Sequence, residues 1–534
     1  MKKQVYNPYL PLNTYIPDGE PHVFGDRVYV YGSHDREGGD RFCELDYECF
    51  SAPVDDLSDW RSEGIIYKCS QDPHIIEKRQ DMYAPDVVRG NDGRYYLYYA
   101  LGGFEGPISV AVCDTPAGKY DYLGDVHYPD GRMFDRYIPF DPGVINDDGQ
   151  IRLYYGWGLG YDLRQMDEQQ VMPIYKMLFG KEADEVRREA LPILGANTVA
   201  LADDMLTVLG EPERVLDAAI AAEPGTPLYD HAFFEAASIR KFNGLYYFIY
   251  SSSVNHELCY ATSQYPDRDF TYRGVIVSNG DVGYAGRKPE DRLAATGTNH
   301  GSIECINGKY YIFYHRNTHN TSFSRQGCAE PITIGPDGTI AQVEMTSCGL
   351  NGGPLMARGE YPAAIACNLT HGHMPHLTQQ ENPKSPNINH EGAVQFIMDI
   401  VDRTWIGFKY FQFEGNERVS VTTRGSGSGV LCVATTLGGE VLARIPVGGG
   451  AGYVAAATDG AGDVAAATDG TGDAVAVTDG AAPDAETTPA DVSAAAGWRT
   501  SAPVAINVSP GTHALYFCYE GTGTIDFLKF ELTV

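Results

Sequence analysis

The sequence has no long hydrophobic run and is short of basic residues. No stretch approaches about 18 uninterrupted apolar residues, and residues 1–8 lack the apolar run of a signal peptide, so we expect a cytoplasmic protein. The 40 Lys and Arg stand against 71 Asp and Glu, giving a formal net charge of −31 and a pI near 4.7. Nucleic acids and anionic membranes are themselves polyanions, so we expect neither as a partner. A neutral ligand fits this charge better.

The sequence also lacks any cysteine spacing that suits a metal or a disulfide framework. Its eleven cysteines are scattered from Cys43 to Cys518 without a close CxxC pair. An odd count in a chain without a secretion signal argues against structural disulfides. We therefore expect free, buried thiols.

The length of 534 residues is more than one ordinary core requires, so we expect two domains. A turn signal followed by alternating aromatic and aliphatic residues occurs five times before residue 320, as in Asp92-Gly93-Arg94-Tyr95-Tyr96-Leu97-Tyr98-Tyr99. The turn glycines are Gly25, Gly93, Gly149, Gly244 and Gly308. Steps of 56 to 95 residues between them are each long enough for a four-stranded blade. The pattern predicts an all-β fold that begins with a five-bladed β-propeller over residues 1–345.

The longest step, between Gly149 and Gly244, contains extra material over residues 165–188. Its charged stretch 182–188 indicates a helical insertion between blades three and four. Such an insertion commonly lies at a rim and walls a pocket.

Seven to nine residues before each turn glycine lies a polar residue that we expect to face the propeller axis. These residues are Asp18, Asp86, Asp141, Glu235 and His300. An Asp beside Gly or Pro can serve turn chemistry alone. Glu235, however, stands in the apolar stretch 233–237, where a lone carboxylate is costly. The set as a whole therefore predicts a functional centre.

Two of these carboxyls differ in their expected protonation. Asp18 lies in a polar turn and should stay ionised, which suits a general base. Glu235 is flanked by apolar residues, so its pKa should rise and suit a general acid. Asp141 would raise that pKa further by like-charge repulsion. Acetal hydrolysis needs such a pair of carboxyls.

In combination, five motifs over residues 5–345 resemble glycoside hydrolase family 43. They are the Tyr-x-Pro-Asp start at residues 15–18, Tyr83-Ala84-Pro85-Asp86, Phe140-Asp141-Pro142-Gly143, Phe234-Glu235 and Gly297-Thr298-Asn299-His300-Gly301. The resemblance implies an inverting mechanism with Asp18 as base, Glu235 as acid and Asp141 as the residue that tunes and orients the acid. It also implies acid and base carboxyls about 6.5–9.5 Å apart, which leaves room for water.

The resemblance further implies a set of substrate-binding residues. The set comprises Tyr83, Asp86, Phe234, Asn299 and Arg325. Tyr83 stands where similar enzymes often have Trp in the sugar-binding wall. Arg325 resembles an arginine of blade five that reaches a sugar hydroxyl, and Asn299 could bind the substrate. For Arg325 and Asn299 a structural role is equally open.

His300 occupies a position from which similar enzymes bring a histidine toward a bound cation or water, so a structural calcium ion on the axis is one reading. The other is a core histidine satisfied by water and the neighbouring carboxylates. We expect no cofactor to be required, and we interpret His22, His34 and His315 as structural or rim residues.

The C-terminal third changes to short alternating strands, which predict a β-sandwich over residues 361–534 after a linker at 346–360. Its ending, residues 511–517 and 521–527, resembles carbohydrate-binding modules of family 6. A sandwich that packs on the propeller and binds no sugar is the alternative. Between two strands, residues 449–497 repeat Thr-Asp-Gly every ten residues and contain eight acidic residues but no Lys or Arg. The calcium-binding nonapeptide pattern is missing, so we expect a disordered acidic insertion.

Together these patterns predict an exo-acting, inverting hydrolase that releases α-L-arabinofuranosyl or β-D-xylosyl units from arabinoxylan- or arabinan-derived plant oligosaccharides. Two alternatives within the same fold are a β-xylosidase as the main activity and a carbohydrate-binding propeller without catalysis. A retaining fructan-cleaving propeller lacks support, since no Asn-Asp-Pro-Asn-Gly lies near the N-terminus.

Overall fold

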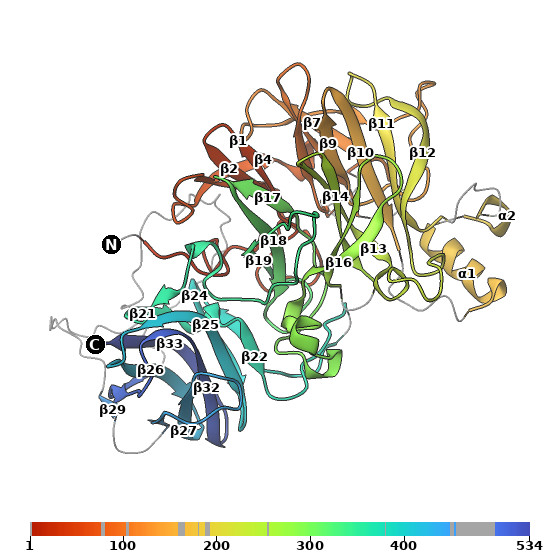
Figure 1. The fold of residues 1–534 in the computed structure, drawn as a ribbon. Coiled ribbons are helices and arrows are strands. Elements are labelled where there is room, and N and C mark those ends of the chain that lie inside the picture. The colour runs from red at the N-terminus through yellow and green to blue at the C-terminus, as the bar shows by residue number, and fades with distance from the viewer. Residues whose placement is uncertain are drawn as a thin grey trace, which may run out of the picture.

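The computed structural model describes residues 3–75, 81–102, 106–158, 166–179, 181–186, 193–253, 256–379, 381–448, 453–454 and 497–534. It comprises a five-bladed β-propeller followed by a β-sandwich (Figure 1). Among the described residues, no helix is both long and apolar enough to cross a membrane. All eleven cysteines are free thiols, as expected, and seven are buried.

Each of the first four blades is a four-stranded antiparallel sheet in chain order, and the fifth has three strands. Blade 1 contains β1 (Glu20–Phe24), β2 (Arg27–Tyr31), β3 (Tyr47–Pro53) and β4 (Arg61–Tyr67). Blade 2 contains β5 (Asp86–Arg89), β6 (Tyr95–Ala100), β7 (Ile108–Cys113) and β8 (Asp121–Asp125). Blade 3 contains β9 (Gly143–Asp147), β10 (Gln150–Trp157), β11 (Gly195–Leu201) and β12 (Val208–Asp217). Blade 4 contains β13 (Phe233–Phe242), β14 (Leu245–Ser252), β15 (Leu258–Ser263) and β16 (Thr271–Val277), and blade 5 contains β17 (Ile303–Ile306), β18 (Lys309–Asn317) and β19 (Arg325–Ile332).

The five predicted hairpins are the first two strands of the five blades, and all five turn glycines have positive φ. In blades 3, 4 and 5 the preceding residue also has positive φ, at Asp148, Asn243 and Asn307. Blades 1 and 2 differ, because only the glycine takes that conformation there. Asp and Asn tolerate this left-handed region better than most residues, which explains the turn signal.

The first strands of the blades surround the axis. β1 contacts β5 and β17, and β9 contacts β5 and β13. A parallel bridge between Gly19 and Gly301 joins blade 1 to the start of blade 5 and closes the ring. At Gly301 a Cβ atom would lie only 1.9 Å from the Phe313 carbonyl oxygen, so this close approach requires glycine. The residue before it, His300, is thereby fixed near the axis.

The predicted insertion between β10 and β11 is helical. Among its described residues are α1 (Glu168–Phe179) and α2 (Ala183–Val186). Val171 and Tyr175 of α1 are buried in a cluster with Phe140 and Trp157, two residues that also line the cavity described below. The insertion thus supports a cavity wall, as expected.

The C-terminal sandwich consists of two sheets. One contains β20 (Leu355–Met356), β22 (Asn368–Thr370), β25 (Trp405–Phe413), β27 (Ser428–Ala434), β28 (Ala443–Val447) and β32 (Gly511–Thr522). The other contains β21 (Gly359–Pro362), β23 (Asn387–Glu391), β24 (Val394–Ile400), β26 (Arg418–Gly425), β29 (Tyr453–Val454), β30 (Arg499–Ser501), β31 (Val504–Ala505) and β33 (Ile525–Thr533). Phe408 and Phe517 of the first sheet pack against Phe530 of the second, with centroids 4.7 and 5.5 Å apart. Most of the acidic segment 449–497 lies outside the described residues.

Short 3-10 helices complete the described secondary structure. They are η1 (Cys69–Gln71), η3 (Tyr229–His231), η4 (Asn279–Asp281), η5 (Tyr284–Gly286), η6 (Pro289–Asp291), η7 (Gly349–Asn351) and η8 (Ala363–Ile365).

A buried charged contact joins the sandwich to the propeller. Lys409 Nζ of β25 lies 3.0 Å from Asp281 Oδ2 and 2.8 Å from Glu344 Oε2. Asn368 Nδ2 donates to the same Asp281 oxygen at 3.1 Å. Blade 5 and the segments next to it face the sandwich (Figure 1). The two domains are therefore docked by specific polar contacts.

Candidate functional site

A cavity of about 410 Å³ opens at one end of the propeller axis. Four of the five predicted axial residues line it, namely Asp18, Asp141, Glu235 and His300. The other lining residues are Phe42, Tyr83, Phe140, Trp157, Phe234, His256, Thr298, Asn299, Ser322, Arg325, His376, Leu377, Thr378 and Gln379. Residues from the N-terminal blade to the C-terminal third thus converge on one cavity.

Asp18 precedes β1 in a left-handed conformation, with φ 56°, and is buried. Its Oδ1 accepts a hydrogen bond from Arg325 Nη1 at 2.9 Å. Burial alone would raise the pKa of Asp18, but the Arg325 charge, together with smaller effects of neighbouring groups that include His300, outweighs it and lowers the pKa below the ordinary value. Asp18 is therefore ionised at neutral pH.

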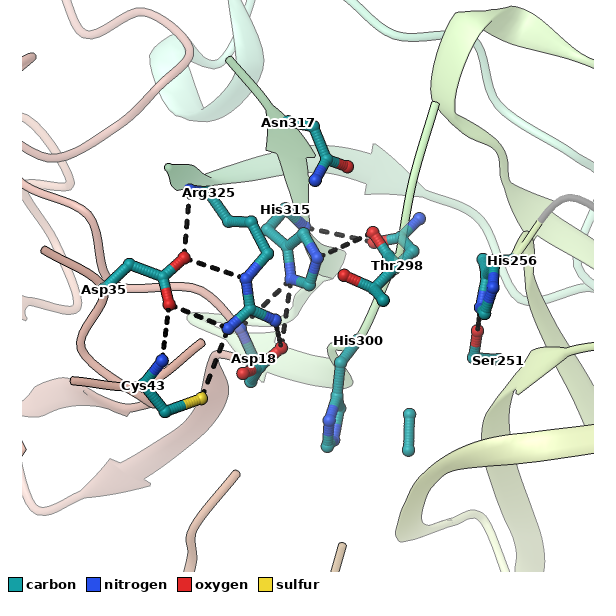
Figure 2. Close-up of polar contacts among 12 residues, drawn as sticks. Asp18, Asp35, Cys43, Ser251, His256, Thr298, His300, His315, Asn317 and Arg325 are labelled. Atoms are coloured by element: carbon teal, nitrogen blue, oxygen red, sulfur yellow. Dashed lines mark hydrogen bonds and ion pairs between the residues drawn. The ribbon is translucent and has the colours of Figure 1, made fainter. Parts of the chain in front are cut away.

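Arg325 is fixed by a second carboxylate, that of Asp35. Its Nε and Nη2 each lie 2.9 Å from an oxygen of Asp35, and Asp35 Oδ1 also accepts from the Cys43 backbone N–H at 3.0 Å. The guanidinium lies over the Phe42 ring at 4.8 Å from the centroid. Figure 2 shows Arg325 between Asp35 and Asp18. A bidentate pair of this kind holds the arginine in one orientation.

His315 supports Asp18 as a neutral ring. The Asp18 backbone N–H donates to Nδ1 at 3.2 Å, so Nδ1 carries no proton, and Nε2 donates to the Thr298 carbonyl at 2.8 Å (Figure 2). Burial lowers the pKa of His315 to about 3, which agrees with that tautomer. The expectation that His315 is structural fits this geometry.

Glu235 lies at an irregularity in β13. The register with β14 shifts on both sides of it, and Ala236 has φ 67°. Such bulges re-aim a side chain out of the regular alternation. The freed Ala236 N–H donates to Asp141 Oδ2 at 3.0 Å, so the same bulge connects the two acidic residues. Asp141 itself precedes β9 with φ 44°.

Each of the two connected acids has a raised pKa. Burial and the Asp141 carboxylate together raise the pKa of Glu235 to about 8, against a lowering effect of His300. Burial also raises the pKa of Asp141, to about 6. One cavity therefore contains an ionised Asp18 and a protonated Glu235 near neutral pH.

His300 lies between carboxylates on the axis. Its Nε2 is 3.7 Å from Glu20 Oε1 and its Nδ1 is 3.8 Å from Asp141 Oδ2. Burial opposes protonation, but the Glu20 and Asp141 carboxylates outweigh it and raise the pKa of His300 to about 9. The ring is thus an imidazolium beside the acids.

Three groups among the described residues bring metal-ligating atoms together. They are Glu37 with His319 and His390, His231 with Glu257 and Cys259, and Glu20 with His22 and Asp86. The last set lies near the axis, but Arg240 Nη2 lies 2.7 Å from Glu20 Oε2 and 3.5 Å from His22 Nε2. A guanidinium therefore already supplies positive charge there.

Asp86 does not line the cavity, contrary to its predicted contact with substrate. It is fully buried, with Oδ1 2.6 Å from His22 Nε2 and Oδ2 accepting from the Val144 backbone N–H at 2.8 Å. Unlike Asp18 and Asp141, Asp86 is the first residue of a regular strand. It ties blade 2 to blade 3. Tyr83, Phe234, Asn299 and Arg325 do line the cavity, and their contact with substrate stays a prediction.

Several residues at the site were missed in the sequence. Asp35 and Glu20 are buried partners of arginines, and His376 comes from the C-terminal third. The only sequence signal for Asp35 was its position shortly after a hairpin, and none existed for His376. Their roles arise from contacts between residues far apart in the chain.

Comparisons with known proteins identify relatives of this chain. Residues 11–181 match the family model described as glycosyl hydrolases family 43. A "Xylosidase/arabinosidase" of Thermoclostridium stercorarium is 48% identical over 84% of this chain and 91% of its own. "Xylosidase/arabinosidase 43A" of Humicola insolens is 32% identical over 57% of this chain and 89% of its own. A solved β-xylosidase/α-arabinofuranosidase from a compost metagenome, in a calcium-free form with xylotriose, is 29% identical, with a TM-score of 0.47 over 63% of this chain and 97% of its own. The chain belongs to glycosyl hydrolases family 43.

Proposed function

We propose that this protein is an inverting, exo-acting glycosidase that releases α-L-arabinofuranosyl or β-D-xylosyl units from plant oligosaccharides. The observation that carries the proposal is the pair of carboxyls with opposite protonation in one cavity. Asp18 has a lowered pKa and Glu235 a raised one, and both line the cavity. Hydrolysis of a glycosidic bond requires one ionised and one protonated carboxyl of this kind.

In this mechanism each carboxyl has one task. Asp18 accepts a proton from a water molecule as that water attacks the anomeric carbon. Glu235 gives its proton to the leaving oxygen on the other side of the bond, so the bond to the leaving group breaks as the bond to water forms. Asp141 keeps Glu235 protonated through its charge and holds the bulge at Ala236. We expect the acid and base carboxyls about 6.5–9.5 Å apart.

Asn299 supports direct substrate binding. Its Oδ1 accepts from the His315 backbone N–H at 3.2 Å, whereas within the described residues its buried Nδ2 has no hydrogen-bond partner. A buried amide without a partner is costly, so a sugar hydroxyl that accepts from it gains binding energy. Arg325 is engaged by Asp18 and Asp35, which favours its role in holding the base.

The preferred pentose is the finer part of the proposal. We place α-L-arabinofuranosyl ahead of β-D-xylosyl. Relatives named for both activities support both sugars as candidate substrates. Release of arabinose or xylose from 4-nitrophenyl α-L-arabinofuranoside and 4-nitrophenyl β-D-xylopyranoside decides between them. Release of neither sugar would favour the non-catalytic propeller. Sugar binding by the sandwich and a cytoplasmic location remain predictions.

Replacement of the acid tests the catalytic proposal. Glu235→Ala should lower turnover of an unactivated oligosaccharide by about 10²–10⁴-fold, because general acid catalysis contributes this much. A nitrophenyl leaving group needs less protonation, so turnover of a nitrophenyl substrate should fall less in this variant. Glu211→Ala, at a side chain that is 75% exposed, is the control. Unchanged turnover of the oligosaccharide in Glu235→Ala removes this residue from the mechanism.

A calcium ion on the axis is a separate part of the proposal. His300 and Glu20 Oε1, which has no hydrogen-bond partner among the described residues, are the groups that would hold it. The ion would supply the positive charge that the His300 proton otherwise supplies. Metal binding to this histidine must displace its proton, so calorimetry in two buffers should report about one proton released per calcium bound. Binding without proton release contradicts this assignment.

A further inference from the structure

We propose that His256 and the segment His376–Gln379 form the binding site for the leaving part of the substrate, the sugar beyond the bond that is cut. This inference rests on the proposed function, since it assigns one side of the same cavity. Its ligand is a neutral pyranose or furanose ring of an oligosaccharide. The segment belongs to the connection between β22 and β23, so the C-terminal third of the chain would determine which oligosaccharides the propeller cuts.

The segment is clamped to the propeller close to the catalytic residues. Leu377 N–H donates to the Thr296 carbonyl at 2.7 Å, and Thr296 N–H donates to the Pro375 carbonyl at 3.1 Å. His376 and Thr296 thereby form a parallel bridge. Thr296 lies four residues before His300 in the same stretch of chain. This backbone pairing gives the segment a defined position at the cavity.

A row of aromatic rings leads from the proposed acid to this segment. Trp157 lies 5.7 Å from Phe234, the neighbour of Glu235, and Phe234 contacts His256 edge to face at 4.6 Å. His256 and His376 then stack at 5.4 Å with an interplanar angle of 4°. An acid that protonates the leaving oxygen must lie on the leaving-group side of the bond. The row begins at that acid, so its outer end faces the leaving sugar.

The two histidines are neutral, which suits a neutral sugar. Burial lowers the pKa of His256 to about 3, and burial also lowers the pKa of His376. Arg292 Nη1 donates to Thr296 Oγ1 at 2.7 Å, and that hydroxyl lies 2.9 Å from His376 Nδ1. Since Arg292 can only donate, the hydroxyl proton is available for Nδ1. This arrangement favours a His376 tautomer with its proton on Nε2, a donor for a sugar hydroxyl.

The rest of the segment adds a mixed surface beside these rings. Leu377 is buried at the cavity wall, whereas Thr378 and Gln379 are exposed. Aromatic faces with a few polar groups at their edge are the usual composition of a small-molecule site. A short aryl leaving group meets only the inner part of this wall. A leaving oligosaccharide would extend along it.

The test compares two leaving groups on one pentose. For His376→Ala, kcat/KM is measured on 4-nitrophenyl β-D-xylopyranoside against xylotriose, and on 4-nitrophenyl α-L-arabinofuranoside against an arabinose-substituted xylotriose. Loss of one hydrogen bond and one ring contact should lower the ratio of oligosaccharide to nitrophenyl activity about tenfold, mainly through KM. His373→Ala, at an exposed histidine of the same connection that does not line the cavity, should keep the parent's ratio.

An unchanged ratio in His376→Ala overturns the proposal, and so does an equal loss on both kinds of substrate. If His376→Ala melts at a lower temperature, His376→Gln decides instead, because it keeps a side-chain donor: partial recovery of the oligosaccharide activity supports the site, and no recovery at the parent's melting temperature contradicts it. Failure of the proposed function would give a different result from failure of this inference, because the unaltered protein would then cleave none of the four substrates.

Discussion

Arg325 Nη1 lies 2.9 Å from Asp18 Oδ1, while the Nε and Nη2 edge of the same guanidinium binds both oxygens of Asp35. One buried cation therefore stands between two buried carboxylates. Asp35 fixes the orientation of the arginine, and the arginine keeps Asp18 ionised. The state of the proposed base thus depends on a residue about 300 positions away in the chain.

Arg325→Lys should move the acidic limb of the pH profile. Lysine keeps a positive charge but lacks the planar set of donors that binds both oxygens of Asp35 while a third N–H reaches Asp18, so Asp18 loses part of its stabilisation and its pKa rises. Activity that requires an ionised Asp18 is lost below its pKa, so the acidic limb of kcat/KM should move to higher pH. The profile of kcat/KM from pH 3 to 10 measures this. An acidic limb at the parent's position would show that Arg325 does not lower the pKa of Asp18.

Asp141→Asn should move the opposite limb. The Asp141 carboxylate raises the pKa of Glu235, which lies at about 8, so its neutralisation lowers that pKa. Activity requires protonated Glu235 and falls as pH rises through its pKa. The basic limb should therefore move to lower pH. Asp148→Asn, at an exposed carboxylate of the same blade, is the control, and an unmoved basic limb in Asp141→Asn contradicts the charge effect.

His300→Gln should move both limbs to higher pH. The positive charge of His300 lowers the pKa of Glu235 and of Asp18, so its removal raises both. Higher pKa values shift the gain of ionised Asp18 and the loss of protonated Glu235 in the same direction. The same kinetic titration tests this. Limbs that move apart or stay in place would show that His300 carries no charge beside the acids.

Lys409→Met should destabilise the contact between the two domains. It leaves Asp281 and Glu344 without their buried cation, and removal of one partner of such a group costs about 3–5 kcal/mol. Lys529→Met is the matched control, because its contact with Glu360 is partly exposed and an exposed pair contributes about 0–1 kcal/mol. Denaturant unfolding of both variants compares them. Equal midpoints would mean that the Lys409 contact adds no stability.

The hairpins were predictable from the sequence because Asp-Gly and Asn-Gly specify turns locally. The polar residues before them were partly predictable. Asp18 and Asp141 leave the strand pattern in left-handed conformations and reach the cavity, whereas Asp86 begins a regular strand and points between blades. Counting back from the turn could not tell these cases apart. Asp35 and His376 could not be found at all, because only the closed ring and the docked sandwich bring them to the site.

The central claim is that Asp18 activates water while Glu235 protonates the leaving oxygen in a single displacement. Proton NMR of the first product, recorded before mutarotation, tests it most directly. With 4-nitrophenyl β-D-xylopyranoside the account predicts α-xylose first, and with the α-L-arabinofuranoside it predicts β-arabinose first. Initial release of the sugar with its original anomeric configuration would contradict the account.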